Sequence, residues 1–284
     1  MARKIFYLTI VNILICGSSL FLQQTKGLDP NRALTQYLQV YYGIDDGLPA
    51  NSVQFITQSS DGYIWLGTQE GAVRFDGVKF EYFDKKTTEA IKNNYVLFIY
   101  ESKDKAIWIG TNGEGVVRLY KNTATNYMQD DGLVNNFVNG ATEDNNGNLY
   151  FATQEGISIF KNGSFVGSIT KKDGLAGDFV NYILHNEKLG LLIGFNGNGF
   201  QIYKDGRFVK LYNTQNGLKD NIINNILVDE YDNIWLATNG GLSVISNNIV
   251  KNYGPEQGLT TAVISYVMKD SRGTMWIASN GGGL

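Results

Sequence analysis

Residues 45–83 read DDGLPANSVQFITQSSDGYIWLGTQEGAVRFDGVKFEYF, and the rest of the chain repeats this stretch with variations. Leu48 of its Gly-Leu pair lies seventeen positions before Trp65. The same offset recurs without insertion or deletion in five further copies, spaced 41 to 43 residues apart. The five further pairs are Ile91 and Trp108, Leu133 and Tyr150, Leu175 and Leu192, Leu218 and Trp235, and Leu259 and Trp276. A fixed period of this length indicates a repeated structural unit.

Each copy predicts four short strands joined by tight turns. In the first copy we expect strands over residues 53–58, 63–68, 72–75 and 78–83. Asp61-Gly62 and Asp76-Gly77 separate the apolar runs, and Asp-Gly is a strong hairpin signal because a type I′ turn needs positive φ at both central residues. Nothing in this repeating part of the chain has helical spacing.

A lone four-stranded antiparallel sheet cannot bury its two apolar faces, so units of this period stack side by side. Radial stacking gives an all-β fold, the β-propeller of four-stranded antiparallel blades. We expect blades to start near residues 46, 89, 131, 173, 216 and 257. The aromatic side chain at the Trp position should pack against the neighbouring blade. A β-sandwich is the alternative, but its strands would not repeat with this period.

The repeated pattern resembles the two-component regulator propeller repeat over residues 37–284. Its consensus here is Asp-Gly-Leu-x-x-Asn-x-Val, then Asp-x-x-Gly-x-Ile-Trp-Leu-Gly-Thr-x-x-Gly-Leu. Copies one, two and five carry it best, at Trp65-Leu66-Gly67-Thr68, Trp108-Ile109-Gly110-Thr111 and Trp235-Leu236-Ala237-Thr238. Copies two, three and four depart from it, at Glu89-Ala90-Ile91, Tyr150-Phe151-Ala152 and Leu192-Ile193-Gly194-Phe195. We therefore expect less regular blades there.

The resemblance also implies a function. Such propellers form the extracytoplasmic sensory part of membrane-spanning receptors, whose later segments include a histidine kinase or another signalling output. It implies a periplasmic location, attachment to the inner membrane in the full-length protein, and a dimeric receptor. It implies no enzymatic activity for this chain itself.

Residues 1–26 predict a signal peptide or another membrane-targeting segment. Arg3 and Lys4 precede an apolar run over residues 5–15, which is too short to span a membrane as a helix. Cys16 is the only cysteine, and Leu14-Ile15-Cys16-Gly17 only faintly resembles a lipoprotein box, because Ile15 is bulky. If the segment is removed beyond Cys16, packing alone must hold the mature chain.

The two ends of the repeat region predict how the ring closes. Residues 37–42 (YLQVYY) read as an outer strand without a blade of its own, so we expect them to complete the last blade. The sixth copy reaches Leu284 where its third strand should begin. We expect a truncated last blade and an incomplete seven-bladed ring, with a six-bladed ring as the alternative.

A candidate binding site follows from the loops between second and third strands, which emerge on one face of a propeller. Their polar residues are Gln69, Glu70, Asn112, Glu114, Gln154, Glu155, Asn196, Asn198, Asn239 and Asn280, here called the loop ring. The entry loops add Asn51, Asn94, Asn136, Asp178 and Asn221 to this face. Amides and carboxylates suit a polyhydroxylated ligand such as an oligosaccharide. Turn formation alone also explains Asn and Asp in tight loops.

Two further sets of side chains are weaker candidates. A polar position in the first strand, at Gln54, Asn139, Asn181, Asn224 and Ser265, either lines the channel or satisfies neighbouring backbone. Tyrosines recur near the outer strand, at Tyr41, Tyr42, Tyr82, Tyr127, Tyr212 and Tyr253. They could stack on sugars, but amphipathic aromatics are often half buried for packing.

Other functions find little support in the composition. His185 is the sole histidine, which leaves no His-rich metal site, and it reads as a half-buried blade residue. No Ca²⁺ loop motif and no cofactor motif appear. The net charge of −3 provides no basic field for nucleic acid. Two alternatives stay open: a propeller lyase or glycosidase, if Glu70, Glu114 and Glu155 converge, and a protein-interaction scaffold.

Overall fold

A computed structural model describes residues 40–283 of the chain. The predicted signal peptide, Cys16 and residues 37–39 lie outside the described residues. The described residues fall into two compact units, residues 41–268 with 276–283 and residue 40 with 269–275. In the described part of the smaller unit, the Asp270 carboxylate caps a turn by accepting from the amides of Arg272 and Thr274, both at 2.9 Å. Within residues 40–283 we find no helix with the length and apolar content that a membrane crossing requires.

The described residues form antiparallel sheets whose strands follow chain order, here called blades 1 to 6. Blade 1 comprises β1 (Val53–Gln58), β2 (Ile64–Thr68), β3 (Gly71–Phe75) and β4 (Phe80–Phe83). Blade 2 comprises β5 (Val96–Glu101), β6 (Ile107–Thr111), β7 (Val116–Tyr120) and β8 (Thr123–Tyr127). Blade 3 comprises β9 (Val138–Glu143), β10 (Leu149–Thr153), β11 (Gly156–Lys161) and β12 (Ser164–Ile169).

Blades 4 and 5 continue the pattern, and blade 6 has two strands in the described residues. Blade 4 comprises β13 (Val180–Asn186), β14 (Gly190–Phe195), β15 (Phe200–Lys204) and β16 (Arg207–Tyr212). Blade 5 comprises β17 (Ile223–Val228), β18 (Ile234–Thr238), β19 (Gly241–Ser246) and β20 (Ile249–Tyr253). Blade 6 comprises β21 (Ile264–Lys269) and β22 (Met275–Ser279).

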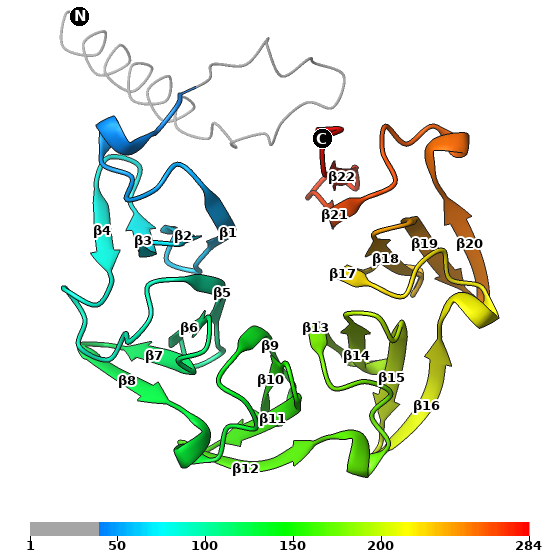
Figure 1. Ribbon diagram of the computed structural model, residues 1–284, viewed down its shortest axis with the longest axis horizontal. Coiled ribbons are helices and arrows are strands. Elements are labelled where there is room, and N and C mark those ends of the chain that lie inside the picture. Colours follow the sequence, from blue (N-terminus) through cyan, green and yellow to red (C-terminus); the bar gives the residue numbers. More distant parts are fainter. Residues whose placement is uncertain (1–39, 284) are drawn as a thin grey trace, which may run out of the picture. The chain divides into compact units, whose positions relative to one another are not determined.

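Within the larger unit, the blades follow one another in chain order with their first strands innermost (Figure 1). The innermost strands of consecutive blades contact each other, as β1 with β5, β5 with β9, β9 with β13 and β13 with β17. The fourth strands β4, β8, β12, β16 and β20 lie at the rim. This arrangement confirms the predicted all-β propeller architecture.

The hydrophobic core lies between blades. Separate clusters of buried residues join blades 1 and 2, 2 and 3, 3 and 4, and 4 and 5. Trp108 of blade 2 is fully buried, with its ring centroid 5.1 Å from that of Phe151 and 5.0 Å from that of Phe160, both in blade 3. The expected packing of the Trp position against the neighbouring blade is therefore confirmed at this junction.

The Asp-Gly-Leu motif forms a short 3-10 turn in the segment that leads into the first strand of a blade. These turns are η2 (Ile44–Asp46), η3 (Gln129–Asp131), η4 (Lys171–Asp173), η5 (Thr214–Asn216) and η6 (Pro255–Gln257). The glycine that follows each turn adopts a left-handed conformation, as at Gly47 with φ 101°. Ala90 stands at this position in copy two, where a Cβ disfavours positive φ. There the turn is built differently, with the Asp84 carboxylate accepting from the amides of Lys86 and Thr87.

The Gly-Thr-x-x-Gly part of the repeat closes the turn between the second and third strands. The buried Thr68 hydroxyl donates to the carbonyl of Gly71 at 2.8 Å and accepts from the amide of Glu70 at 3.0 Å. Thr111, Thr153 and Thr238 donate in the same way to Gly115, Gly156 and Gly241. The motif is therefore explained by local backbone bonding.

Two expectations from the sequence concern the departing copies and the closing strand. Blades 2, 3 and 4 each contain four strands, because hydrophobic residues of other shapes fill the same positions, and the departure in copy two is seen in its altered turn. The closing strand at 37–42 stays a prediction, since Val40, Tyr41 and Tyr42 are not in a strand and residues 37–39 lie outside the described residues. The Tyr42 ring instead packs edge-on against Phe75 and Phe80 of blade 1, with centroid distances of 5.0 and 5.7 Å.

Candidate functional site

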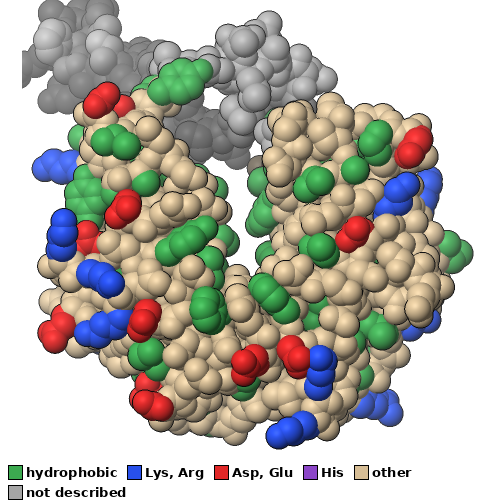
Figure 2. Space-filling view, in the orientation of Figure 1, with side chains coloured by type: hydrophobic (Ala, Val, Ile, Leu, Met, Phe, Trp, Pro, Cys, Tyr) green, Lys and Arg blue, Asp and Glu red, His purple; other side chains and the backbone are tan. Residues whose placement is uncertain are grey.

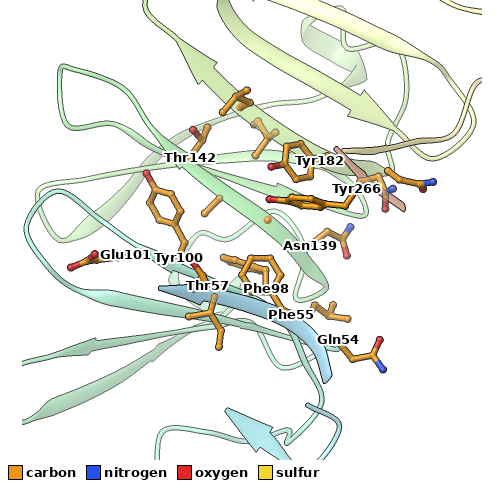
Figure 3. A pocket seen from close by; sticks show the side chains of 18 of the residues that line it. Gln54, Phe55, Thr57, Phe98, Tyr100, Glu101, Asn139, Thr142, Tyr182 and Tyr266 are labelled. Carbon is orange, nitrogen blue, oxygen red and sulfur yellow. The ribbon is translucent and has the colours of Figure 1, made fainter. Parts of the chain in front are cut away.

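A cavity of about 510 Å³ lies between the innermost strands of the larger unit. Its size falls within the range of about 300 to 1,000 Å³ that is usual for small-molecule sites. Figure 2 shows the hollow between the blades, and Figure 3 shows the side chains around it. Residues of β1, β5, β9, β13, β17 and β21 line it, so each blade contributes its first strand.

Three asparagines at equivalent positions of β9, β13 and β17 line the cavity and also join blades. Asn139 Nδ2 donates to the carbonyl oxygen of Val180 at 2.9 Å. Asn181 Nδ2 donates to that of Ile223 at 2.7 Å, and Asn224 Nδ2 donates to that of Ile264 at 2.8 Å. The sequence left two roles open for this polar position, lining the channel or satisfying backbone, and these three amides have both. We call these three residues the amide set.

The amide oxygens of this set are left for another donor. A carbonyl accepts hydrogen bonds only, so it fixes the amide orientation with Nδ2 toward the next blade and Oδ1 elsewhere. No donor of the described residues bonds to Oδ1 of Asn139, Asn181 or Asn224. The other two members of the predicted position differ, since Gln54 Nε2 donates to Ser52 Oγ and Ser265 is exposed.

Aromatic side chains form the wall of the cavity. Figure 3 shows the rings of Tyr182 and Tyr266 side by side, with Tyr100 farther along the cavity. Burial and the neighbouring Tyr266 phenol raise the pKa of Tyr182. Burial, together with the charge of Glu143, raises the pKa of Tyr100 to about 12. Both phenols therefore stay protonated at neutral pH and can donate hydrogen bonds.

Glu101 is the one carboxylate among the described residues that line the cavity, and its oxygens bond to a residue of blade 1. Its two oxygens accept from the amide and the hydroxyl of Ser60 in blade 1, at 2.7 and 2.6 Å. In Figure 3 it points away from the other labelled side chains. Gly140 of β9 leaves open space, because no atom lies within 4 Å of the position that a Cβ would take there.

The structure gives the loop ring mainly backbone roles. The amides of Glu70 and Glu155 donate to Thr68 and Thr153 inside their own turns. Those of Asn112, Gln154, Asn196 and Asn280 donate to the entry segments of their own blades. Gln69, Glu70, Glu155, Asn196, Asn198 and Asn280 are exposed, while Asn112, Glu114, Gln154 and Asn239 are half buried. None of the ten lines the central cavity, and only Asn239 is bonded to a residue that does, since its Oδ1 accepts from Asn224 Nδ2 at 2.9 Å.

The entry-loop candidates brace turns. Oδ1 of Asn51, Asn136 and Asn221 accepts from the first amide of the preceding 3-10 turn, at 3.1, 2.9 and 2.8 Å. Asn94 accepts from the amide of Lys85 in the altered turn, at 3.0 Å. Asp178 pairs with Lys171 at 2.5 Å. These side chains therefore stabilise the loops before each blade, which explains why they recur in the sequence.

The candidate tyrosines do not form one surface. Tyr41 is 81% exposed, whereas Tyr212 is 4% exposed and stacks near Phe200 in blade 4. Tyr127 packs against Trp108, with 5.9 Å between centroids. The remaining candidates are Tyr42 and Tyr82, which are exposed, and Tyr253, which is half buried. Tyr182, Tyr266 and Gly140 were not among the sequence candidates, although all three stand at one repeat position, seven residues after the Leu anchor, where copies one and two carry Phe55 and Phe98. This recurrence of aromatic side chains was a signal that could have found the wall of the cavity.

His185 is half buried in β13, as expected, and its backbone amide donates to Thr142 Oγ1 at 2.9 Å. In the described part of the chain, no group of three or more His, Cys, Asp or Glu side chains is placed to hold a metal ion.

The family model described as "Two component regulator propeller" matches residues 47–70, 90–113, 132–155 and 217–240. These segments lie in blades 1, 2, 3 and 5 and include two copies that depart from the consensus. No curated protein matches the sequence.

Several solved structures share the fold at low sequence identity. One is the extracellular domain of BT3049 from B. thetaiotaomicron, assigned as a hybrid two component system, with 23% identity, a TM-score of 0.67, and coverage of 86% of this chain and 41% of that one. Another is a catalytically inactive virginiamycin B lyase from Staphylococcus aureus with quinupristin, with 14% identity, a TM-score of 0.65, and coverage of 81% and 78%. A third is PorZ, a surface component of the type-IX secretion system of Porphyromonas gingivalis, with 14% identity, a TM-score of 0.59, and coverage of 81% and 38%.

The chain spans about two fifths of the length of the first structures in this comparison. At these identities, the structural likeness is evidence for the fold alone. The matched repeats add the sequence evidence. The chain therefore contains four segments that match the two component regulator propeller model, in blades 1, 2, 3 and 5.

Proposed function

We propose that this chain is the sensory propeller of a two-component signalling receptor and binds a polyhydroxylated ligand, such as an oligosaccharide, outside the cytoplasm. The observation that supports this most directly is the match of four segments to the family model. The fold shared with the extracellular domain of BT3049 agrees with an extracytoplasmic place for the propeller. The signal peptide predicted at residues 1–26 would take it there.

The chemistry of the central cavity supports ligand binding better than proton transfer. Its lining combines amides, hydroxyls and aromatic rings, which is the composition of a recognition site. A glycosidase or lyase of the alternative kind needs an acid and a base that converge on one substrate. Glu101 is tied to Ser60, and Glu70, Glu114 and Glu155 do not line the cavity.

The output of the receptor lies beyond this chain in our proposal. We infer that the full-length protein is a dimer attached to the inner membrane and carries a histidine kinase or another signalling segment. The propeller itself contributes recognition and no catalysis, needs no cofactor, and has no nucleic acid partner.

Isothermal titration calorimetry of the 284-residue chain against a panel of neutral and acidic oligosaccharides tests this function. The proposal expects saturable binding of at least one glycan without its turnover. Turnover of a glycan, followed by chromatography, would favour the propeller enzyme. Failure of every glycan to bind would favour a protein-interaction scaffold.

A further inference from the structure

The central cavity assigns a chemical class to the ligand, on the premise that the proposed sensory function is correct. We propose that the cavity binds a neutral polyol, about one or two sugar rings in size. Its hydroxyls donate to Oδ1 of Asn139, Asn181 and Asn224, and its apolar face packs on the rings of Tyr182 and Tyr266. Binding and the joining of blades 3 to 6 then use the same three amides.

The acceptors are preorganised because each amide is held at its other end. Nδ2 of each residue is fixed by a carbonyl of the next blade at 2.7 to 2.9 Å. The Oδ1 atoms therefore need no rotation to accept, and a bound hydroxyl costs little side-chain entropy. Three acceptors on three consecutive blades suit a molecule with several O–H donors.

The neutrality of the ligand follows from the charges around the cavity. The Glu101 carboxylate accepts from Ser60 and pairs with Lys105 Nζ at 3.9 Å, and burial raises the pKa of the Tyr100 and Tyr182 phenols, which stay uncharged. The amide set contributes dipoles without net charge. An ionic ligand would lose its hydration without gaining a counter-charge, which is costly.

Binding at Oδ1 should also strengthen the bonds made by Nδ2. Accepting a hydrogen bond at the amide oxygen polarises the amide and makes its N–H groups better donors. A ligand in the cavity would therefore tighten the bonds from β9 to β13, from β13 to β17 and from β17 to β21. The propeller would report occupancy by stiffening these blade junctions.

Gly140→Phe tests the location of the site. The new side chain should enter open space in the cavity, and Gly140 has no positive φ that a side chain would strain. Gly167→Phe is the matched control, since Gly167 lies on the rim strand β12 with equally open space around its Cβ position. The probes are maltose, cellobiose and xylobiose, with digalacturonate as the acidic comparison, titrated into the full chain by calorimetry.

We expect Gly140→Phe to weaken binding of the neutral disaccharide at least tenfold and Gly167→Phe to leave it unchanged. Leu97→Asn provides a second test that does not depend on how Gly140→Phe folds. Leu97 occupies the amide-set position of β5 and lines the cavity, so an asparagine there adds a fourth oxygen acceptor. It should raise the affinity several-fold, as expected for one further hydrogen bond.

Different binding results would contradict the cavity site, the neutral ligand class and the sensory function. Neutral sugar that binds Gly140→Phe and wild type equally well overturns the cavity site and leaves the sensory function standing. Binding of digalacturonate alone overturns the neutral class. Absence of binding by all four probes to the wild-type chain counts against both.

Discussion

The junction between blades 2 and 3 and the junction between blades 4 and 5 occupy equivalent places in the propeller but are built from different chemistry. The first is aromatic, with Trp108 enclosed by Phe151 and Phe160. The second is aliphatic, with Leu192 at the Trp position, packed in one cluster with Ile223 and Leu236. At the junction of blades 4 and 5, Asn181 also donates a hydrogen bond to the Ile223 carbonyl. The equivalent residue at the junction of blades 2 and 3 is Leu97, which cannot donate one.

The contrast teaches that the repeat keeps the position of a contact and leaves its chemistry free. A junction can be held by a large ring that fills the space between blades. It can also be held by smaller side chains with a hydrogen bond at the inner edge, where the cavity begins. The junctions with amides are those that can take part in binding, so the two kinds should respond differently to the same tests.

The largest effect is expected at the aromatic junction. Trp108→Ala should lower the free energy of unfolding by about 3 to 5 kcal/mol, because a fully buried ring is replaced by a cavity. Trp235→Ala should cost less, since Trp235 is half buried, although the sequence alone gives both residues the same role. Urea unfolding measures both, with Tyr231→Ala as a control at a 77% exposed ring. Equal losses for Trp108 and Trp235 would contradict the greater contribution expected from the fully buried ring.

A smaller loss is expected at the amide junction. Asn181→Leu removes the donor to the Ile223 carbonyl and should lower the free energy of unfolding by about 1 to 2 kcal/mol. The control is Asn196→Leu in the same blade, an exposed member of the loop ring, which should stay within about 0.5 kcal/mol. If the two variants lost the same stability in urea, the amide would have no special role at the junction.

The indole N–H groups of Trp235 and Trp108 have different acceptors, so their responses to acid should depend on different carboxylates. Trp235 Nε1 donates to the Asp229 carboxylate at 2.9 Å, whereas Trp108 Nε1 donates to the Ser102 hydroxyl at 3.0 Å. Burial acts to raise the pKa of Asp229, but the bonds from Trp235 and Asn233 outweigh it and lower the pKa below its usual value of 3.8. A depressed folded pKa stabilises the fold fully above the unfolded value of about 3.9, and this contribution is lost as pH falls through the folded pKa.

Nitrogen-15 NMR of the indole signals measures this difference. We expect the Trp235 signal to titrate below pH 3.8 through Asp229, and the Trp108 signal to respond to acid through Asp104, whose carboxylate accepts from Ser102 Oγ at 2.5 Å. Asp229→Asn should remove the Trp235 transition. The Trp108 signal should keep its transition in this variant, because Asp104 is unchanged. A Trp235 transition that persists, or a Trp108 transition that disappears, would contradict the assignment of partners.

The smallest effect concerns the surface of the amide junction. Lys188 of blade 4 pairs with Asp232 of blade 5, with side chains 72% and 37% exposed. Lys188→Ala should cost less than about 1 kcal/mol, and the difference should shrink in 1 M salt. Asp232→Asn should give the same small loss by thermal unfolding. A large, salt-independent loss would mean that the ion pair, and not Asn181, holds this junction.

The period of the sequence was enough to predict the blades because one strong spacing constrains every copy. The offset from Leu48 to Trp65 recurs across copies, and it fixes strands, turns and the position that packs between blades. At the predicted closing strand, the Tyr42 ring packs against Phe75 and Phe80 of blade 1, and the period of the sequence does not encode these contacts.

The site was only partly predictable. Asn139, Asn181 and Asn224 recur with the period and were recognised as channel candidates. Aromatic rings of the wall also recur, at Phe55, Phe98, Tyr182 and Tyr266, but recurring aromatics in a strand are equally expected in a core, so the period did not mark them as cavity residues. The loop ring recurs because its backbone closes turns, and a periodic signal does not distinguish that role from binding.

Hydrogen exchange of the full chain with and without a bound neutral disaccharide shows whether the inner amides take part in binding. We predict slower amide exchange in the innermost strands β9, β13, β17 and β21, with the rim strands β12, β16 and β20 unchanged. Protection confined to the loop ring, at residues 112–114, 154–155 and 196–198, would contradict it. That result would place the ligand on the outer loops and leave the three amides as joints between blades only.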